Sequence, residues 1–221
     1  MERTQFIKDA VRRLLSEIPP SVTILAACKT RSIEEVQAAF EAGINHFGHN
    51  YVQEAQAMIP NIAFKAKWHL IGHLQRNKAE EAAKLFDCVQ IIDSSRIALE
   101  LEKYCSKLNK IMPILVEVNS GCEENKTGIY PEELNQLVDV IGTCQHLLLE
   151  GLMTMGPRVG NQQDSRRYFI ETRHLFEQLQ SKALPNAQIH ILSMGMSSDY
   201  QIAIEEGANM IRLGTAIFGE R

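Results

Sequence analysis

Apolar and polar positions alternate along this chain in an order that repeats a strand followed by a helix. Residues 1–17 carry apolar side chains at helical spacing, which predicts an amphipathic helix ahead of the first strand. Residues 22–28 are a short apolar run, typical of a strand that is buried on both faces. A capping-box pattern at Ser32 and Glu35 then opens a helix that ends at Gly43.

The same unit recurs to the end of the chain. Strands are expected at residues 22–28, 45–47, 68–71, 88–92, 114–118, 147–153, 188–192 and 210–213. Helices are expected between them at residues 32–43, 51–58, 77–85, 95–107, 131–142, 163–180 and 198–207. Alternating strands and helices predict a parallel sheet with right-handed crossovers.

Eight such strands favour one closed (β/α)8 TIM barrel with an extra N-terminal helix. An open doubly wound sheet is the alternative, but it needs a phosphate-binding motif after its first strand. Neither G-x-G-x-x-G nor G-x-x-x-x-G-K-[ST] is present. No linker or low-complexity segment divides the chain, so we expect a single domain over residues 1–221.

Composition narrows the class of protein. The 221 residues are 45% hydrophobic and 23% charged, which is ordinary for a globular protein. The net charge of −4 argues against binding to nucleic acid, and no apolar stretch is long enough to span a membrane. The N-terminus lacks the apolar core of a secretion signal. The five cysteines are an odd number without a C-x-x-C pair, so we expect reduced thiols in a cytoplasmic protein.

Chemically active residues of such a barrel lie at the C-terminal ends of its strands. Lys29 follows the first strand, where partial desolvation would favour the free amine, which is the nucleophilic form. The alternative is a solvated lysine at a strand end.

Two glycine-containing loops follow the last two strands. In them, Gly195 and Gly214 stand near Ser197, Ser198 and Thr215. Barrel enzymes often bind phosphate in these two loops, where amides and hydroxyls are available as donors. The alternative is a set of turn glycines and helix caps such as any α/β protein contains.

A resemblance to a known family emerges from motifs that occur in order along nearly the whole chain. They are Cys28-Lys29-Thr30, residues 47–54 (FGHNYVQE), 68–72 (WHLIG), 74–78 (LQRNK), 126–128 (KTG), 151–153 (GLM), 192–199 (LSMGMSSD) and 212–219 (RLGTAIFG). Together they resemble the pyridoxal phosphate homeostasis proteins, which are single-domain relatives of the alanine racemase N-terminal barrel.

The resemblance implies a cofactor and a site. Lys29 would hold pyridoxal 5′-phosphate (PLP) as a Schiff base, and Arg212 would face the pyridine nitrogen. The resemblance assigns the phosphate and the ring to five further residues: Ser197, Gly214 and Thr215 at the phosphate, and Asn50 and His69 along the ring. Where the family usually has Glu, this chain has His49, which calls into question any role of a carboxylate there.

Arg212 also bears on whether the protein catalyses a reaction. A guanidinium only donates hydrogen bonds, so it leaves a ring nitrogen unprotonated, and an unprotonated ring is a weak electron sink. The racemases use a second base from an added domain, which we expect this chain to lack because it ends seven residues after Gly214. We therefore expect no catalytic residue, and a monomeric PLP carrier in vitamin B6 and amino-acid homeostasis, with PLP-dependent apo-enzymes as recipients.

Three other functions remain open at this point. The chain is alternatively a PLP-dependent amino-acid racemase or lyase, a Schiff-base aldolase acting on a phosphorylated sugar through Lys29, or a regulatory module that works through its surface. The pairs His46/His49 and His69/His73 have spacings seen in metal sites, but no Cys or carboxylate cluster completes either pair, so we expect no metal.

Overall fold

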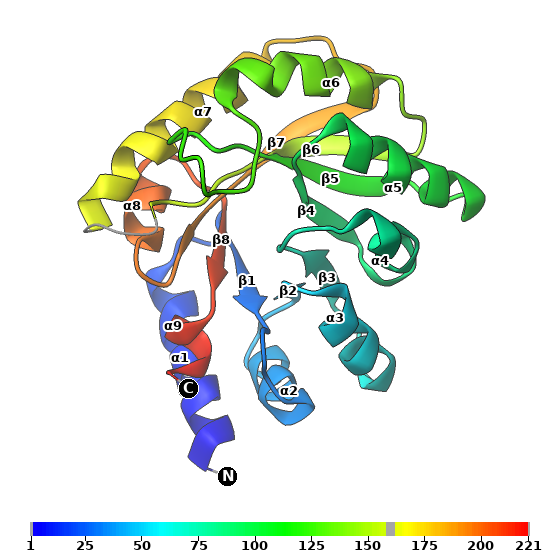
Figure 1. Ribbon diagram of the computed structural model, residues 1–221. Helices are drawn as coiled ribbons and strands as arrows, with labels where there is room; N and C mark the ends of the chain where they lie inside the picture. Colours follow the sequence, from blue (N-terminus) through cyan, green and yellow to red (C-terminus); the bar gives the residue numbers. More distant parts are fainter. Residues whose placement is uncertain (1, 158–161, 221) are drawn as a thin grey trace.

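The computed structural model describes residues 2–157 and 162–220, and within them eight parallel strands close into a barrel in chain order (Figure 1). This confirms the (β/α)8 prediction and excludes the open sheet. The strands are β1 (Thr23–Ala27), β2 (His46–His49), β3 (Lys67–Leu70), β4 (Cys88–Ile92), β5 (Met112–Glu117), β6 (Leu147–Met153), β7 (Ala187–Met196) and β8 (Met210–Leu213).

Helices surround the barrel and connect its strands (Figure 1). The α-helices are α1 (Glu2–Glu17), α2 (Ile33–Glu41), α3 (Val52–Met58), α4 (Ala79–Leu85), α5 (Ser95–Lys107), α6 (Leu134–Gly142), α7 (Arg166–Gln180), α8 (Tyr200–Glu205) and α9 (Thr215–Phe218). Short 3-10 turns are η1 (Ile59–Asn61), η2 (Arg76–Lys78), η3 (Pro131–Glu133) and η4 (Gln162–Ser165). Helix α1 precedes the barrel as predicted and packs against α2 and α9; Met1 lies outside the described residues.

Local sequence signals account for several of these elements. The Ser32 hydroxyl accepts the Glu35 amide while the Glu35 carboxylate accepts the Ser32 amide, which confirms the capping box that starts α2. All five residues of β4 are buried, as expected for a parallel strand with the barrel interior on one face and helices on the other.

The apolar core has two parts. The larger one fills the layer between the outer wall of the barrel and the helices, with Phe47, Leu70 and Phe169 fully buried in it. A small cluster of Leu25, Ile71 and Met210 lies inside the barrel. The interior also holds buried polar side chains, which are described with the site.

The seventh strand and the helix after it differ from the sequence prediction. Strand β7 continues four residues beyond the predicted end, because Met196 still pairs with Arg212 across a register shift. Gly195 permits this shift, since its φ is +92° and a Cβ there would stand 2.5 Å from the Ala203 Cβ. Helix α8 begins after Asp199 rather than at Ser198, and Asp199 makes no capping hydrogen bond to it.

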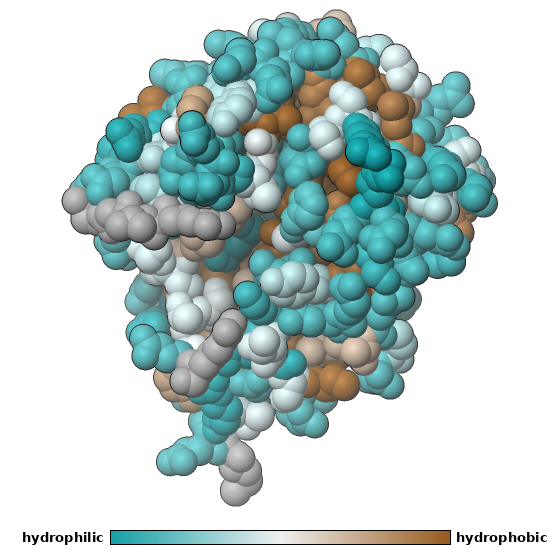
Figure 2. Space-filling model, in the orientation of Figure 1, coloured by the Kyte–Doolittle hydropathy of each residue, from teal (hydrophilic) through white to brown (hydrophobic). Residues whose placement is uncertain are grey.

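The surface adds little to the functional picture. Hydrophilic residues cover most of the face shown in Figure 2, and hydrophobic residues are exposed on it in separate places. Among the described helices, none combines the length and the apolarity that crossing a membrane requires. All five cysteines are unpaired thiols, four of them buried.

Candidate functional site

A cavity of about 350 Å³ opens at the C-terminal ends of the barrel strands. This volume lies within the range of small-molecule sites. The residues around it come from six strand ends: Ala27, Asn50, Ile71, Met155, Met196, Ser197, Ser198, Arg212, Gly214 and Thr215. Five of the seven residues that the sequence proposed for a cofactor therefore share one cavity.

Ser197 and Gly214 form the side of the cavity at the start of α9. The Ser197 Oγ accepts hydrogen bonds from the amides of Gly214 and Ala216, each at 3.1 Å. Both lone pairs of this oxygen are then in use, so its proton is left to donate, and no described residue accepts it. Gly214 leaves room beside it, because a Cβ there would meet nothing closer than the Ala27 Cβ at 3.8 Å. This arrangement suits an anion that accepts a hydrogen bond from the Ser197 hydroxyl.

Arg212 reaches the cavity from inside the barrel. Its Nη1 donates to Ser193 Oγ at 2.9 Å and its Nη2 donates to the Thr154 carbonyl at 2.7 Å. Burial lowers the pKa of Arg212 to about 10, while the charges of Glu117 and Asp199 act in the opposite direction. The guanidinium is thus a fixed cation at neutral pH, with further N–H donors for a ligand.

Lys29 stands at the rim, in the turn that follows β1, and its side chain is half-buried. Its Nζ lies 5.7 Å from the centroid of the Tyr51 ring. Ala27, two residues earlier, lines the cavity, so the turn that carries Lys29 lies beside the cavity mouth.

His69 lies in a buried polar row inside the barrel and not among the described residues that line the cavity. Its Nε2 is 2.9 Å from His46 Nδ1, and its Nδ1 is 3.0 Å from Gln90 Nε2. Gln90 Oε1 accepts the Ser193 hydroxyl at 2.8 Å, which links the row to Arg212. Burial lowers the pKa of His69 to about 3, with smaller contributions from His46 and Lys67.

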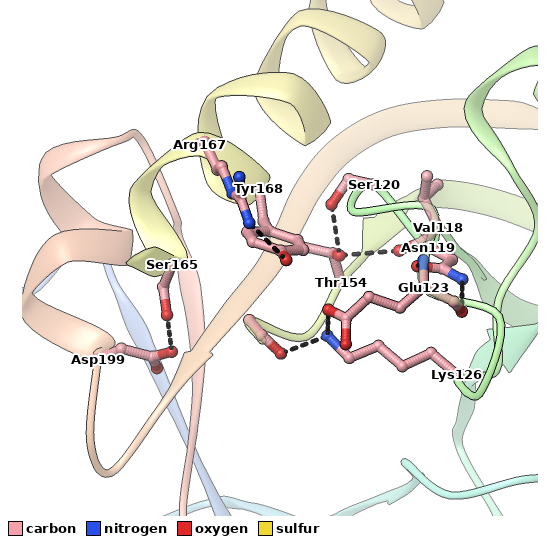
Figure 3. Close-up of polar contacts among 11 residues, drawn as sticks. Val118, Asn119, Ser120, Glu123, Lys126, Thr154, Ser165, Arg167, Tyr168 and Asp199 are labelled. Carbon is pink, nitrogen blue, oxygen red and sulfur yellow. Dashed lines mark hydrogen bonds and ion pairs between the residues drawn. The ribbon is translucent and has the colours of Figure 1, made fainter. Parts of the chain in front are cut away.

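The loop after β7 is held by a buried carboxylate. Asp199 Oδ1 accepts a hydrogen bond from the Met196 amide at 2.7 Å. Its Oδ2 accepts one from the Ser165 hydroxyl at 2.8 Å, as Figure 3 shows. These bonds fix the segment that carries Ser197. The sequence places Asp199 only at the start of the helix expected at residues 198–207 and gives no signal for Ser165, because the pairing joins residues far apart in the chain.

A second lysine fastens the loop between β5 and α6 near the same mouth. Lys126 Nζ donates to the Gly156 carbonyl at 2.7 Å and pairs with Glu123 at 2.6 Å (Figure 3). It also lies 5.0 Å from the centroid of the Tyr168 ring. Lys126 thus ties this loop to the segment after β6, where Met155 lines the cavity.

His49 points away from the cavity, into the layer outside the barrel. It is fully buried beside Trp68, with ring centroids 5.7 Å apart, and it borders a separate hollow of about 300 Å³. Neither ring nitrogen has a hydrogen-bond partner among the described residues, and burial lowers the pKa of His49 to about 4. His49 is therefore part of the outer layer and not of the described wall of the cavity.

Comparison with known proteins shows which family the chain belongs to. The family model of the alanine racemase N-terminal domain matches residues 4–221. A pyridoxal phosphate homeostasis protein of Pasteurella multocida is 40% identical over 221 residues, covering 98% of this chain and 94% of that protein. The chain belongs to the pyridoxal phosphate homeostasis protein family.

Solved structures extend the comparison. PipY of Synechococcus elongatus, solved with PLP bound, is 32% identical with a TM-score of 0.88, covering 96% of this chain and all of that one. A protein from Bifidobacterium adolescentis is 32% identical with a TM-score of 0.93, covering 98% of this chain and 96% of that one. Alanine racemase from E. faecalis has a TM-score of 0.75 at 18% identity over 99% of this chain and 58% of that one, which shows the shared barrel alone. The pyridoxal phosphate homeostasis family thus has the barrel of the racemases.

Proposed function

We propose that this protein binds PLP in the cavity at the C-terminal end of the barrel and holds it as a Schiff base on Lys29. The amine would condense with the aldehyde carbon of PLP with loss of one water. The observation that carries the proposal is the convergence of Ser197, Gly214 and Arg212 on one cavity beside the Lys29 turn. The PLP-bound structure of PipY, a relative by sequence and fold, supports it.

Each part of the cavity matches a part of PLP. The Ser197 hydroxyl and the open space at Gly214 suit the phosphate, with Thr215 beside them. Asn50 borders the same cavity, whereas His69 would act on the ring only through the polar row that ends at Arg212. The roles of these residues stay predictions.

Arg212 would face the pyridine nitrogen and favour a carrier over an enzyme. When bound, PLP supplies an electron sink for reactions at amino-acid Cα atoms, and this sink is weak when the ring nitrogen is unprotonated. Arg212 remains a cation at neutral pH and gives up no proton to that nitrogen. Among the described lining residues no other side chain is an acid or a base, so apart from Lys29 itself the cavity supplies no second base of the kind that racemisation needs. We infer little turnover and a role in storing and supplying PLP.

The cellular setting follows as part of the same proposal. Five unpaired thiols suit a reducing cytoplasm. We infer a monomer that passes PLP to PLP-dependent apo-enzymes, in keeping with relatives named for PLP homeostasis.

The absorption spectrum of the purified protein tests the proposal. Addition of PLP to the wild type is expected to produce a yellow Schiff-base band, which Lys29→Ala abolishes. Lys65→Ala removes an exposed lysine and serves as the matched control that keeps the band. A band of equal strength in Lys29→Ala refutes the assignment, and rapid stereoinversion of an amino acid by the wild type would favour a racemase instead.

A further inference from the structure

The polar row inside the barrel runs from Arg212 at the cavity through the interior to His46, the first residue of β2. It contains Arg212, Ser193, Gln90, His69 and His46, contributed by β8, β7, β4, β3 and β2. Consecutive members are 2.8–3.0 Å apart. Four of the five are buried, and His46 is half-buried. Water therefore has little access to exchange these bonds for others.

Arg212 dictates the direction of every bond in its part of the row. A guanidinium has donors only, so Ser193 Oγ must accept from it. The single hydroxyl proton of Ser193 then goes to Gln90, whose carbonyl end accepts it. The amide end of Gln90 is thereby turned toward His69.

The same direction of hydrogen bonding continues at the two histidines of the row. The Gln90 amide donates to His69 Nδ1, which must be unprotonated to accept. The His69 proton is then on Nε2, and it is donated to Nδ1 of His46. Each member donates toward His46, and no bond in the row can be reversed alone without placing two donors or two acceptors face to face.

We propose that Ser193, Gln90 and His69 are positioning residues that hold the Arg212 guanidinium in place below the cavity, and that Gln90 fixes the Nε2–H tautomer of both histidines. The effect of these residues on PLP binding rests on the proposed function, whereas the direction of the hydrogen bonds within the row does not. Gln90 is the pivot, because its side chain alone presents a carbonyl to one neighbour and an amide to the other.

Neutral histidines are a condition of this arrangement. A protonated His69 would turn an N–H on Nδ1 toward the Gln90 amide. Burial lowers the pKa of His69 to about 3, and burial together with Lys67 lowers the pKa of His46 against the opposing charge of Asp87. Met210 also packs on the pivot, with its Sδ 3.1 Å from Gln90 Nε2. The surroundings of the row therefore agree with its hydrogen bonds.

Substitutions at Gln90 separate positioning from simple packing. Gln90→Glu keeps the shape but presents oxygens to both neighbours, so once the new carboxyl group is ionised His69 must carry a proton on Nδ1. Gln90→Met keeps the volume and removes both hydrogen bonds, which frees Ser193 and loosens Arg212. Gln178→Glu, an exposed residue of α7, is the matched control for the added charge.

Nitrogen-15 NMR of histidine- and arginine-labelled, ligand-free protein at pH 7 measures the tautomers directly. The expected result is Nε2–H for His69 and His46 in the wild type and in Gln178→Glu, and a proton on Nδ1 of His69 in Gln90→Glu. In Gln90→Met the Arg212 Nη protons are expected to exchange with solvent at least tenfold faster. Wild-type His69 with its proton on Nδ1 alone overturns the inference, and this measurement needs no variant to fold.

Titration with PLP connects the row to the cavity. Gln90→Met is expected to weaken PLP binding about tenfold, because a freed Ser193 no longer holds the charged Arg212, and one hydrogen bond of a charged group contributes about that much. An unchanged dissociation constant with unchanged Arg212 exchange overturns the positioning role. Failure of the wild type to bind PLP would instead refute the proposed function, and the tautomers of the ligand-free protein would still decide this inference.

Discussion

His49 makes the stability of this protein depend on pH in a way that one substitution can isolate. The imidazole is fully buried without a hydrogen-bond partner among the described residues, and burial lowers its pKa from the ordinary 6.5 to about 4. The unfolded chain therefore binds a proton at higher pH than the folded protein does. The free energy of unfolding must fall as the pH is lowered through the window from 6.5 to 4.

The size of the effect follows from the two pKa values. One pKa unit corresponds to about 1.4 kcal/mol, so His49 accounts for a loss of about 2 kcal/mol at pH 5 and about 3 kcal/mol at pH 4, relative to pH 7. His69, with a pKa of about 3, adds a loss that continues to lower pH. His49→Phe removes the first contribution and leaves the second. It also removes a buried polar group that lacks a partner, so it is expected to stabilise the protein by about 1 kcal/mol or more at pH 7.

Urea unfolding of the ligand-free protein between pH 7 and pH 4 measures these changes. The difference in unfolding free energy between His49→Phe and the wild type should grow by about 3 kcal/mol over this range. His174→Phe, an exposed histidine of α7, is the matched control and should follow the wild type. Parallel pH curves for His49→Phe and the wild type would refute the reasoning.

Three further substitutions test separate parts of the structure. Gly214→Ala should fold normally, because the nearest atom to the added Cβ is the Ala27 Cβ at 3.8 Å. It should bind PLP at least tenfold more weakly by titration, and wild-type affinity would contradict the assignment of the cavity. Lys126→Met breaks the hydrogen bond to the Gly156 carbonyl, so it should lower the unfolding free energy by about 1–3 kcal/mol and speed amide hydrogen exchange in residues 119–128. Unchanged exchange would contradict the role of Lys126 in holding this loop. Ser32→Ala should cost about 1 kcal/mol in urea unfolding and leave PLP binding intact.

The fold was predictable because its strongest signals are local. The runs at residues 88–92 and 147–153 are mostly apolar, interrupted only by Gln90 in the first and by Glu150 and Gly151 in the second, and the structure gives β4 and β6 these same limits. The end of β7 was not predictable from the sequence, because a glycine such as Gly195 is typical of a turn, whereas in the barrel it belongs to the strand. Strand β5 begins two residues before the expected residue 114, because Pro113 still pairs with Leu148 although it has no amide donor.

The site was predictable in part. Ser197, Gly214 and Arg212 follow or end strands, and all strand ends of one polarity meet at one mouth. The depth of a side chain within the barrel has no such local signal, so the sequence could not place His69 in the row with Gln90. Ser165 was missed for a related reason, since its partner Asp199 is 34 residues away.

Borohydride reduction of the PLP-loaded protein, followed by peptide mass spectrometry, tests the central claim most directly. Reduction turns the Schiff base into a stable secondary amine and so marks the lysine that held the aldehyde. The expected result is one pyridoxyl phosphate group per chain, on Lys29. A label on another lysine with Lys29 unmodified, or no label after loading, would contradict the account.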